Sequence, residues 1–200
     1  MLTLSHNVVT SAFVSVTVRH VDVARAGLAN VGQQRHEVAR ALGWGPMKIA
    51  IGCDEAGYAL KEILKPFIVA LGHEVTDFGT FDGKPVLYPD IGHAVAAAVA
   101  AGKHESAVLI CGTGIGMAIT ANKVKGIRAA QCHDTYSAER ARKSNDAQIV
   151  TFGARVIGPE LAKSIVNSFL ASHFNGGPSA EKVERIKAYE NGATERPIQV

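Results

Sequence analysis

Short apolar runs alternate with longer amphipathic segments from Met47 onward. The apolar runs predict strands at residues 48–51, 74–78, 107–110, 127–131 and 148–152. The segments between and after them predict helices at 58–71, 91–101, 115–123, 136–144, 159–172 and 180–189, with Asp90 as a candidate cap of the second. Continuous apolar strands that alternate with helices are typical of an α/β fold, a parallel sheet covered on both faces.

Residues 1–46 do not show this alternation of apolar runs and amphipathic segments. Their periodicity is weak, and the stretch 43–46 (GWGP) is typical of a linker. No basic n-region precedes an apolar stretch, so a secretory signal is not expected. We expect residues 1–46 to be a poorly ordered extension or translated upstream sequence, with Met47 as the natural start. The folded domain is then 47–191, followed by a tail at 192–200.

Polar residues gather where the predicted strands end. Asp54 and Glu55 follow the first strand, residues 111–116 the third, His133 the fourth and Arg155 the fifth. Ligands of parallel α/β sheets bind at the carboxyl ends of the strands. These groups are therefore expected to converge on one site.

The segment 111–116 (CGTGIG) is the most informative of these. It lies between a predicted strand and a predicted helix, and helix N-termini present free N–H groups and a positive dipole end that suit an anion. A cysteine at that position is expected to be more acidic than a free thiol, whose pKa is about 8.5. The segment therefore predicts a base or nucleophile, Cys111, beside a cradle for negative charge.

Two nucleotide-binding motifs do not fit this segment. A dinucleotide fingerprint needs a third glycine at position 117, which is Met117, and an acidic residue about twenty positions later, where the chain reads AAQC. A P-loop needs a Gly-Lys-Ser/Thr sequence, which does not follow. A purely structural glycine turn remains an alternative.

The other candidates each have two interpretations. Asp54 either caps a helix or binds a ligand, and Asn145 either belongs to a turn or contacts a substrate. The sequence context of His133, just after the fourth predicted strand, favours a structural role over a catalytic one. Arg155 suits a phosphate because a guanidinium matches phosphate bidentately. Lys182 belongs to a solvated face or reaches a phosphate.

Composition narrows the classes of function. The 200 residues carry a net charge of +3 without a Lys/Arg block, which does not favour nucleic acid. The three cysteines lack metal-ligand spacing, and we expect Cys53 and Cys132 to be small buried hydrophobes. No apolar run reaches the roughly 20 residues of a membrane span. A cytoplasmic protein with no metal, cofactor, nucleic-acid or membrane partner is expected.

Several motifs in order resemble the ribose-5-phosphate isomerase B family, which includes galactose-6-phosphate isomerase subunits. They span residues 47 to about 189 and are GCD (52–54), YPD (88–90), ICGTGIGM (110–117), ANK (121–123), GIRA (126–129), YSA (136–138), ND (145–146) and FGARV (152–156). The resemblance implies a three-layer α/β/α sandwich with a five-stranded parallel, Rossmann-like sheet. It also implies a metal-free aldose–ketose isomerase, a homodimer or homotetramer with active sites at the subunit interface.

The resemblance assigns roles to particular residues. Cys111 matches the base that moves a proton between C1 and C2, and Thr113 matches the residue that assists proton transfer at the substrate oxygens. The backbone amides of 112–116 match an anion hole for the enediolate. The expected substrate-binding residues are Asp54, Glu55, Tyr88, Gly112, Gly114, Ile115, Gly116, His133, Asn145, Arg155 and Lys182.

The chain also departs from the family pattern. Glu55 and Ser144 each replace a His, the second of which opens the furanose ring in ribose-phosphate members. Pro178 replaces a phosphate-binding Arg, and Lys182 is the next basic position. A tetrose 4-phosphate has its O4 blocked and cannot form that ring. The chain therefore resembles the branch that interconverts D-erythrulose 4-phosphate and D-erythrose 4-phosphate.

Three alternatives remain from the sequence. One is ribose-5-phosphate isomerase B itself, with His133 or water opening the ring. Another is a non-catalytic phosphosugar-binding subunit, against which the intact Cys111 and Thr113 argue. A thiol-redox function is the weakest of the three, because no resolving cysteine lies nearby in sequence.

Overall fold

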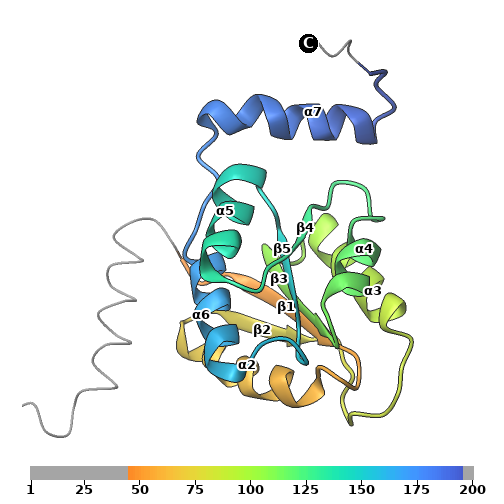
Figure 1. Ribbon diagram of the computed structural model, residues 1–200, viewed down its shortest axis with the longest axis vertical. Coiled ribbons are helices and arrows are strands. Elements are labelled where there is room, and N and C mark those ends of the chain that lie inside the picture. The colour runs from red at the N-terminus through yellow and green to blue at the C-terminus, as the bar shows by residue number, and fades with distance from the viewer. Residues whose placement is uncertain (1–44, 196–200) are drawn as a thin grey trace, which may run out of the picture.

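The computed structural model describes residues 45–195, which form a parallel sheet packed between helices (Figure 1). Its strands are β1 (Lys48–Cys53), β2 (Glu74–Asp77), β3 (Ser106–Cys111), β4 (Ala129–Gln131) and β5 (Ile149–Gly153). They lie in the order β2-β1-β3-β5-β4, and every neighbouring pair is parallel. The predicted five-stranded parallel sheet is confirmed.

Helices cover both faces of this sheet. The face that carries α2 (Tyr58–Ala70), α5 (Thr135–Asn145) and α6 (Pro159–Leu170) is opposite the face that carries α3 (Tyr88–Ala100) and α4 (Ile115–Ala121) (Figure 1). The short 3-10 turn η1 (Gly177–Ser179) leads to α7 (Ala180–Glu190), which lies apart from both layers at the top of Figure 1. The three-layer α/β/α sandwich is thus confirmed.

Strand alternation divides the core into two layers. Successive side chains of a strand point to opposite faces of the sheet. Ile110 and its neighbour Cys53 therefore pack in the layer under α2 and α6, while Leu109 and Cys111 pack in the layer under α3 and α4. All six residues of β3 are buried, which fits a central strand covered on both sides.

Several predicted boundaries differ from the structure by one to three residues, and two of these differences have a clear local cause. Helix α3 begins at Tyr88 rather than at 91, so Asp90 lies in its first turn and is not its cap. Pro89 explains the earlier start, because its fixed φ suits the first turn of a helix. Strand β4 is three residues long rather than five, since Ile127 belongs to a turn in which its N–H donates to the Val124 carbonyl.

Two acidic residues shape the ends of α5. Asp134 caps α5, because its side chain accepts a hydrogen bond from the Ser137 N–H. Asp146 follows α5 in the left-handed conformation, with a φ of 48°, as expected of a turn at this position.

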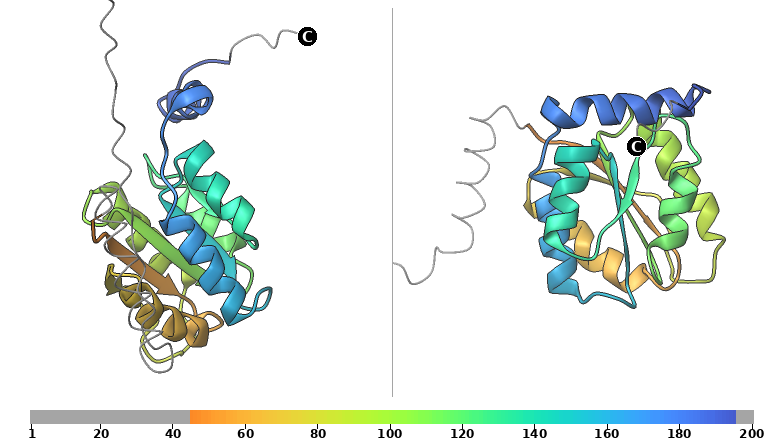
Figure 2. Two further views of the ribbon diagram at one scale, coloured as in Figure 1. Left: turned by 90° about the vertical axis from the view of Figure 1, so that its left-hand side faces the viewer. Right: turned by 45° about the horizontal axis from the view of Figure 1, so that its top comes forward.

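The final helix, α7, crosses the amino edge of the sheet. Two turned views show it lying beyond the ends of the layers (Figure 2). Glu190 near its end accepts a hydrogen bond from the Gly126 N–H at 2.7 Å. Val183 is the one residue of α7 that is buried, and Ile186 and Tyr189 are about half exposed.

None of the helices within residues 45–195 is long and apolar enough to cross a membrane. The expectations for residues 1–44 lie outside the described residues.

Candidate active site

The candidate site lies at the carboxyl ends of β1, β3 and β5, three neighbouring strands in the centre of the sheet. The chain leaves β1 toward one edge and later returns to β3 on its other side. Ligands of open α/β sheets bind at such a change of direction. Asp54, Cys111 and Arg155 each stand at or just after the end of one of these strands, as the sequence predicted.

Cys111 is the last residue of β3, and only 5 % of it is exposed. The Gly114 N–H donates a hydrogen bond to its Sγ at 3.0 Å. Within residues 45–195, the N–H groups of Gly112, Thr113 and Gly116 make no hydrogen bond to another protein group. Hydrogen-bond donors without an acceptor lie close to the thiol, an arrangement that suits a ligand oxygen carrying negative charge.

Two glycines allow the loop to fold in this way. Gly114 has a φ of +82°, and a Cβ there would lie 2.7 Å from the backbone of Phe152. A Cβ on Gly153 would lie 2.6 Å from the Cα of Thr113. The loop after β3 therefore rests directly on the backbone of β5, which only glycine permits at these positions.

Two polar side chains that the sequence analysis missed hold the same loop. The Gln131 amide donates to the Thr113 carbonyl at 2.7 Å, and the Thr151 hydroxyl donates to the Gly114 carbonyl at 2.9 Å. A signal for Thr151 was present, because a hydroxyl inside the apolar run of a central strand needs a partner. Gln131 had no such signal, since it is exposed on an edge strand.

Asp54 and Arg155 flank the loop on its two sides. Asp54 accepts a hydrogen bond from the Gly57 N–H at 3.0 Å, so it shapes the turn before α2 but is not its cap. Burial raises the pKa of Asp54, an effect that the positive charge of Arg155 opposes. The Arg155 guanidinium lies within 3.5 Å of the position that a Cβ on Gly112 would take. The Asp54 carboxyl and the Arg155 guanidinium are thus close enough to interact electrostatically beside the loop that follows Cys111.

The loop between β2 and α3 closes another side of the site. The Glu55 carboxylate accepts a hydrogen bond from the Val86 N–H at 3.4 Å. The ring of Tyr88 rests on Gly116, where a Cβ would come within 2.6 Å of it. Gly116 therefore keeps room for Tyr88 at the start of α4.

His133 has the structural contact that its sequence context favoured. The Gly153 N–H donates to its Nε2 at 3.0 Å. A ring nitrogen that accepts a hydrogen bond carries no proton, so the neutral imidazole holds its hydrogen on Nδ1. His133 thereby ties the end of β4 to the end of β5.

Asn145 and Lys182 do not lie with the other candidates. Asn145 ends α5, and its carbonyl accepts from the Arg128 side chain, directly before β4. This is the amino edge of the sheet, opposite Cys111. Lys182 is exposed on α7, which crosses the same amino edge (Figure 1). Within one chain neither side chain shares a pocket with Cys111.

Lys61 is the largest feature that the sequence analysis missed. Its side chain is fully buried and its ammonium donates to both carboxylate oxygens of Asp77, at 2.7 and 2.6 Å, and to the Thr80 carbonyl at 2.8 Å. The ammonium also lies 5.5–5.6 Å from the ring centres of Tyr58 and Phe81. Its signal was a lysine on the apolar face of a helix. Lys61 fixes the loop that closes the site.

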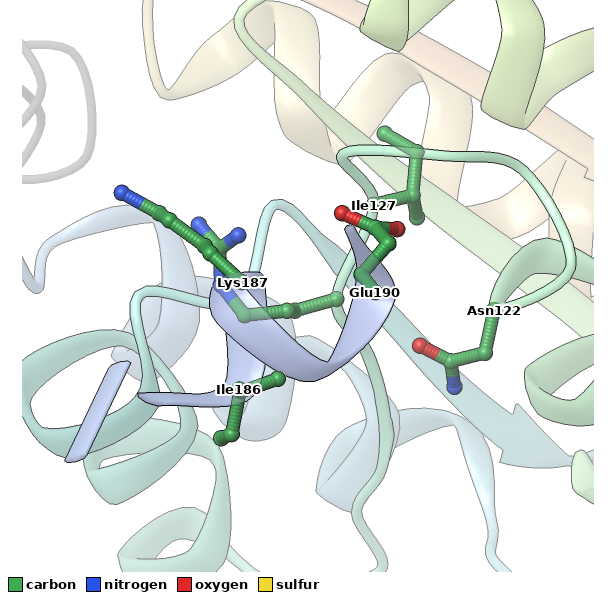
Figure 3. Close-up of a pocket in the computed structure, with 6 residues that line it drawn as sticks. Asn122, Ile127, Ile186, Lys187 and Glu190 are labelled. Carbon is green, nitrogen blue, oxygen red and sulfur yellow. The ribbon is translucent and has the colours of Figure 1, made fainter. Parts of the chain in front are cut away.

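A cavity of about 300 Å³ lies away from this site, between α7 and the segment before β4 (Figure 3). Its charged groups already have partners. Arg128 pairs with Asp146 at 2.7 Å, Lys187 pairs with Glu184 at 2.7 Å, and Glu190 accepts from Gly126. We therefore assign no ligand to it. The described residues hold no group of three His, Cys, Asp or Glu side chains that could bind a metal ion.

The fold and the site together define an α/β enzyme with a buried thiol beside free backbone donors. Residues 49–186 match the family model described as Ribose/Galactose Isomerase, and the chain belongs to that family. The predicted resemblance is confirmed, and the chain is an aldose–ketose isomerase of this family.

Individual relatives agree with this assignment. D-erythrulose-4-phosphate isomerase of Pectobacterium atrosepticum is 54 % identical over 147 residues, which cover 72 % of this chain and 96 % of the relative. Ribose-5-P isomerase B of Listeria innocua is 59 % identical over 141 residues, 70 % of this chain and 95 % of the relative. The solved structure of Clostridium thermocellum ribose-5-phosphate isomerase B matches with a TM-score of 0.72 and 46 % identity, covering 73 % of this chain and 99 % of that one.

Proposed function

We propose that this protein interconverts the aldose and ketose forms of a small sugar phosphate through a cis-enediolate, with Cys111 as the base. The observation that carries the proposal is the contact between the Cys111 thiol and the Gly114 N–H, beside three N–H groups that have no acceptor among residues 45–195. A thiolate can remove a proton from carbon next to a carbonyl, and fixed N–H donors stabilise the oxyanion that forms.

The proton balance of the reaction assigns a role to Thr113, the other reactive side chain of the loop. Cys111 takes the proton from C1 of the ketose and returns it to C2 of the enediolate, which gives the aldose. A proton must also move from O1 to O2. The Thr113 hydroxyl suits this step, because its oxygen already accepts from the Ile115 N–H at 3.3 Å and its own hydrogen remains available to donate.

The substrate that we favour is D-erythrulose 4-phosphate, with D-erythrose 4-phosphate as product. Ser144 stands where the ribose-phosphate members carry the ring-opening His, and its hydroxyl accepts a hydrogen bond from Arg140. A serine has no pKa suited to proton transfer near neutral pH. A four-carbon 4-phosphate, whose O4 is blocked, needs no such group. The relative from Pectobacterium atrosepticum carries this activity in its name.

Ribose 5-phosphate is the second candidate. The relative from Listeria innocua is named ribose-5-P isomerase B and is 59 % identical to this chain. This candidate requires another route for ring opening, such as water or His133. The Nε2 of His133 already accepts a hydrogen bond from the Gly153 N–H, which leaves Nδ1–H as the group of this ring for opening the sugar.

Each complete site is expected to combine two copies of the chain. Asn145 matches a substrate contact but lies at the amino edge, far from Cys111 of its own chain. Large apolar side chains near the site are well exposed, including Phe81 at 70 % and Leu87 at 73 %. Burial of such side chains against a second copy is the usual drive for a stable dimer.

Side-by-side kinetics test the substrate. We expect the purified protein to show a higher kcat/KM for D-erythrulose 4-phosphate than for ribose 5-phosphate, and a lower value still for a six-carbon 6-phosphate. A preference for ribose 5-phosphate would overturn the four-carbon assignment while leaving the reaction intact. Absence of turnover with all three would overturn the proposed function.

A further inference from the structure

Arg140 and Ser144 form a polar pair on α5. The Arg140 guanidinium donates a hydrogen bond to the Ser144 hydroxyl one helical turn later. The buried residues of α5 are Ala138 and Ala141, so the pair lies away from the stripe that packs on the sheet. The Arg140 side chain is 43 % exposed. Ser144 directly precedes Asn145, the residue expected to reach the site of a second copy.

The other cations near this end of α5 already have close partners. Arg128 pairs with Asp146 at 2.7 Å, Arg142 donates to the Ala147 carbonyl at 2.6 Å, and Lys143 pairs with Glu139 at 3.2 Å. The carboxylate contact of Arg140 is much weaker, 3.9 Å from Glu139. Arg140 therefore keeps most of its five N–H donors for a ligand.

The proposed substrate needs such a donor. A sugar phosphate carries up to two negative charges and three acceptor oxygens on its terminal group. At the carboxyl edge Arg155 can satisfy part of this demand. The family pattern places a further arginine after the double glycine, where this chain has Pro178. Lys182 remains as the next basic candidate, but the position of Pro178 itself carries no cation.

We propose that Arg140 supplies the cation that this position lacks and binds the terminal phosphate of the substrate in the site of the partner copy, with Ser144 as its support. The inference rests on the proposed function. Arg140 and Ser144 lie one turn apart on the same side of α5, and Ser144 directly precedes Asn145, so the pair lies beside the residue expected in the partner's site. The Ser144 oxygen accepts from Arg140 while its hydrogen stays free to donate to the phosphate.

A simpler role for Arg140 makes a different prediction. A hydrogen bond between side chains one turn apart, such as Arg140 to Ser144, stabilises a helix by itself. Neutralising Arg140 would then lower the melting temperature without changing substrate affinity. Affinity and stability must therefore be measured on the same variants.

The test compares Arg140→Gln, Ser144→Ala and Arg140→Lys with wild type and with Lys143→Gln, a control that removes a charge from the same helix. The assays are KM and kcat for D-erythrulose 4-phosphate, the inhibition constant of inorganic phosphate, and Tm. We expect Arg140→Gln to raise KM and the phosphate inhibition constant about 10- to 100-fold, the range expected on losing a charge-assisted hydrogen bond. Ser144→Ala is expected to show a smaller rise, and Arg140→Lys an intermediate one because it keeps the charge but loses the fork.

The outcomes separate this inference from the proposed function. If the wild type is active but KM is the same in Arg140→Gln, or rises equally in Lys143→Gln, the role of Arg140 is overturned and the proposed function stands. A fall in Tm without a change in KM would assign Arg140 to the stability of α5 and also overturn it. A wild type without activity on any of the sugar phosphates would reject the proposed function instead.

Discussion

At the scale of single residues, three cysteines in similar places have different surroundings. Cys53, Cys111 and Cys132 all lie at or next to the end of a strand and are all buried. Burial raises the pKa of Cys53 to about 12 and that of Cys132 to about 11. Cys111 is the cysteine that receives a backbone N–H hydrogen bond from a glycine loop. The loop, rather than burial, distinguishes the candidate base.

Replacing Cys111 by alanine tests this distinction. Cys111→Ala is expected to lower kcat by at least about 100-fold, the lower range for loss of a general base, because the variant lacks the thiol that we propose removes the C1 proton. The measurements are steady-state kinetics and a thermal melt. The matched control is Cys132→Ala, which removes a buried thiol from the end of β4 and should keep kcat within about twofold. Similar losses in both variants would argue that packing, not proton transfer, is the role of Cys111.

At the scale of elements, a buried charge joins α2 to β2 and to the loop that follows. Burial tends to raise the pKa of Asp77, but the hydrogen bonds from Lys61 and Lys65 outweigh it and lower that pKa. Removing one partner of a buried pair leaves an uncompensated charge. The network therefore both stabilises the fold and positions the loop that carries Val86 and leads to Tyr88 at the start of α3.

Lys61→Met is expected to lower the free energy of unfolding by about 3 kcal/mol, the lower end for a broken buried pair, since Lys65 still contacts Asp77. The control Lys65→Met removes a partly exposed lysine and should cost less than about 1 kcal/mol. Denaturant unfolding measures both. Equal losses in the two variants would contradict a special role for burial at Lys61.

The same pair predicts a pH dependence. A carboxyl whose pKa is lower in the folded state contributes stability above its unfolded pKa, about 3.9 for Asp, and loses it as the pH falls through the folded value. The difference in stability between wild type and Lys61→Met should therefore be constant near neutral pH and shrink below about pH 4. A difference that grows on acidification would refute this account.

The elements themselves were predictable from the sequence, and their contacts were not. Period and apolar runs predicted every strand and helix of residues 47–190, because buried parallel strands and amphipathic helices have distinct patterns. The start of α3 was misplaced because Asp90 looked like a cap while Pro89 decided the first turn. Lys61 and Gln131 escaped because their partners, Asp77 and Thr113, lie far away in sequence.

At the scale of the whole molecule, the sequence predicted the members of the site but not their distribution. Strand ends with polar residues predicted the cluster around Cys111, since parallel strands end at one edge. Asn145 and Lys182 came from the family pattern, which implied sites at a subunit interface but not which of these residues a partner copy supplies. The structure places both at the opposite edge. We infer from this separation that a second copy completes the site.

Mixing two inactive variants tests the shared site. Cys111→Ala and Asn145→Ala homodimers are both expected to be impaired. After mixing under conditions that exchange subunits, a mixed dimer holds one site with both native residues. Random exchange should then restore about one quarter of wild-type activity, since half of the dimers are mixed and each has one of two sites intact. No recovery, despite exchange verified by mass spectrometry, would place Asn145 outside the site of the partner.

The division of the core into two layers has a consequence for oxidative damage. Cys53 and Cys111 end neighbouring strands, yet they point to opposite faces of the sheet. Cys132 shares the layer of Cys53, and its strand β4 lies two positions from β3, roughly 10 Å at the usual strand spacing, so Cys132 is also beyond the reach of a disulfide with Cys111. A sulfenic acid formed on Cys111 therefore finds no internal thiol to capture it. Peroxide should inactivate the enzyme, and small thiols such as glutathione, rather than a resolving cysteine, would have to restore it.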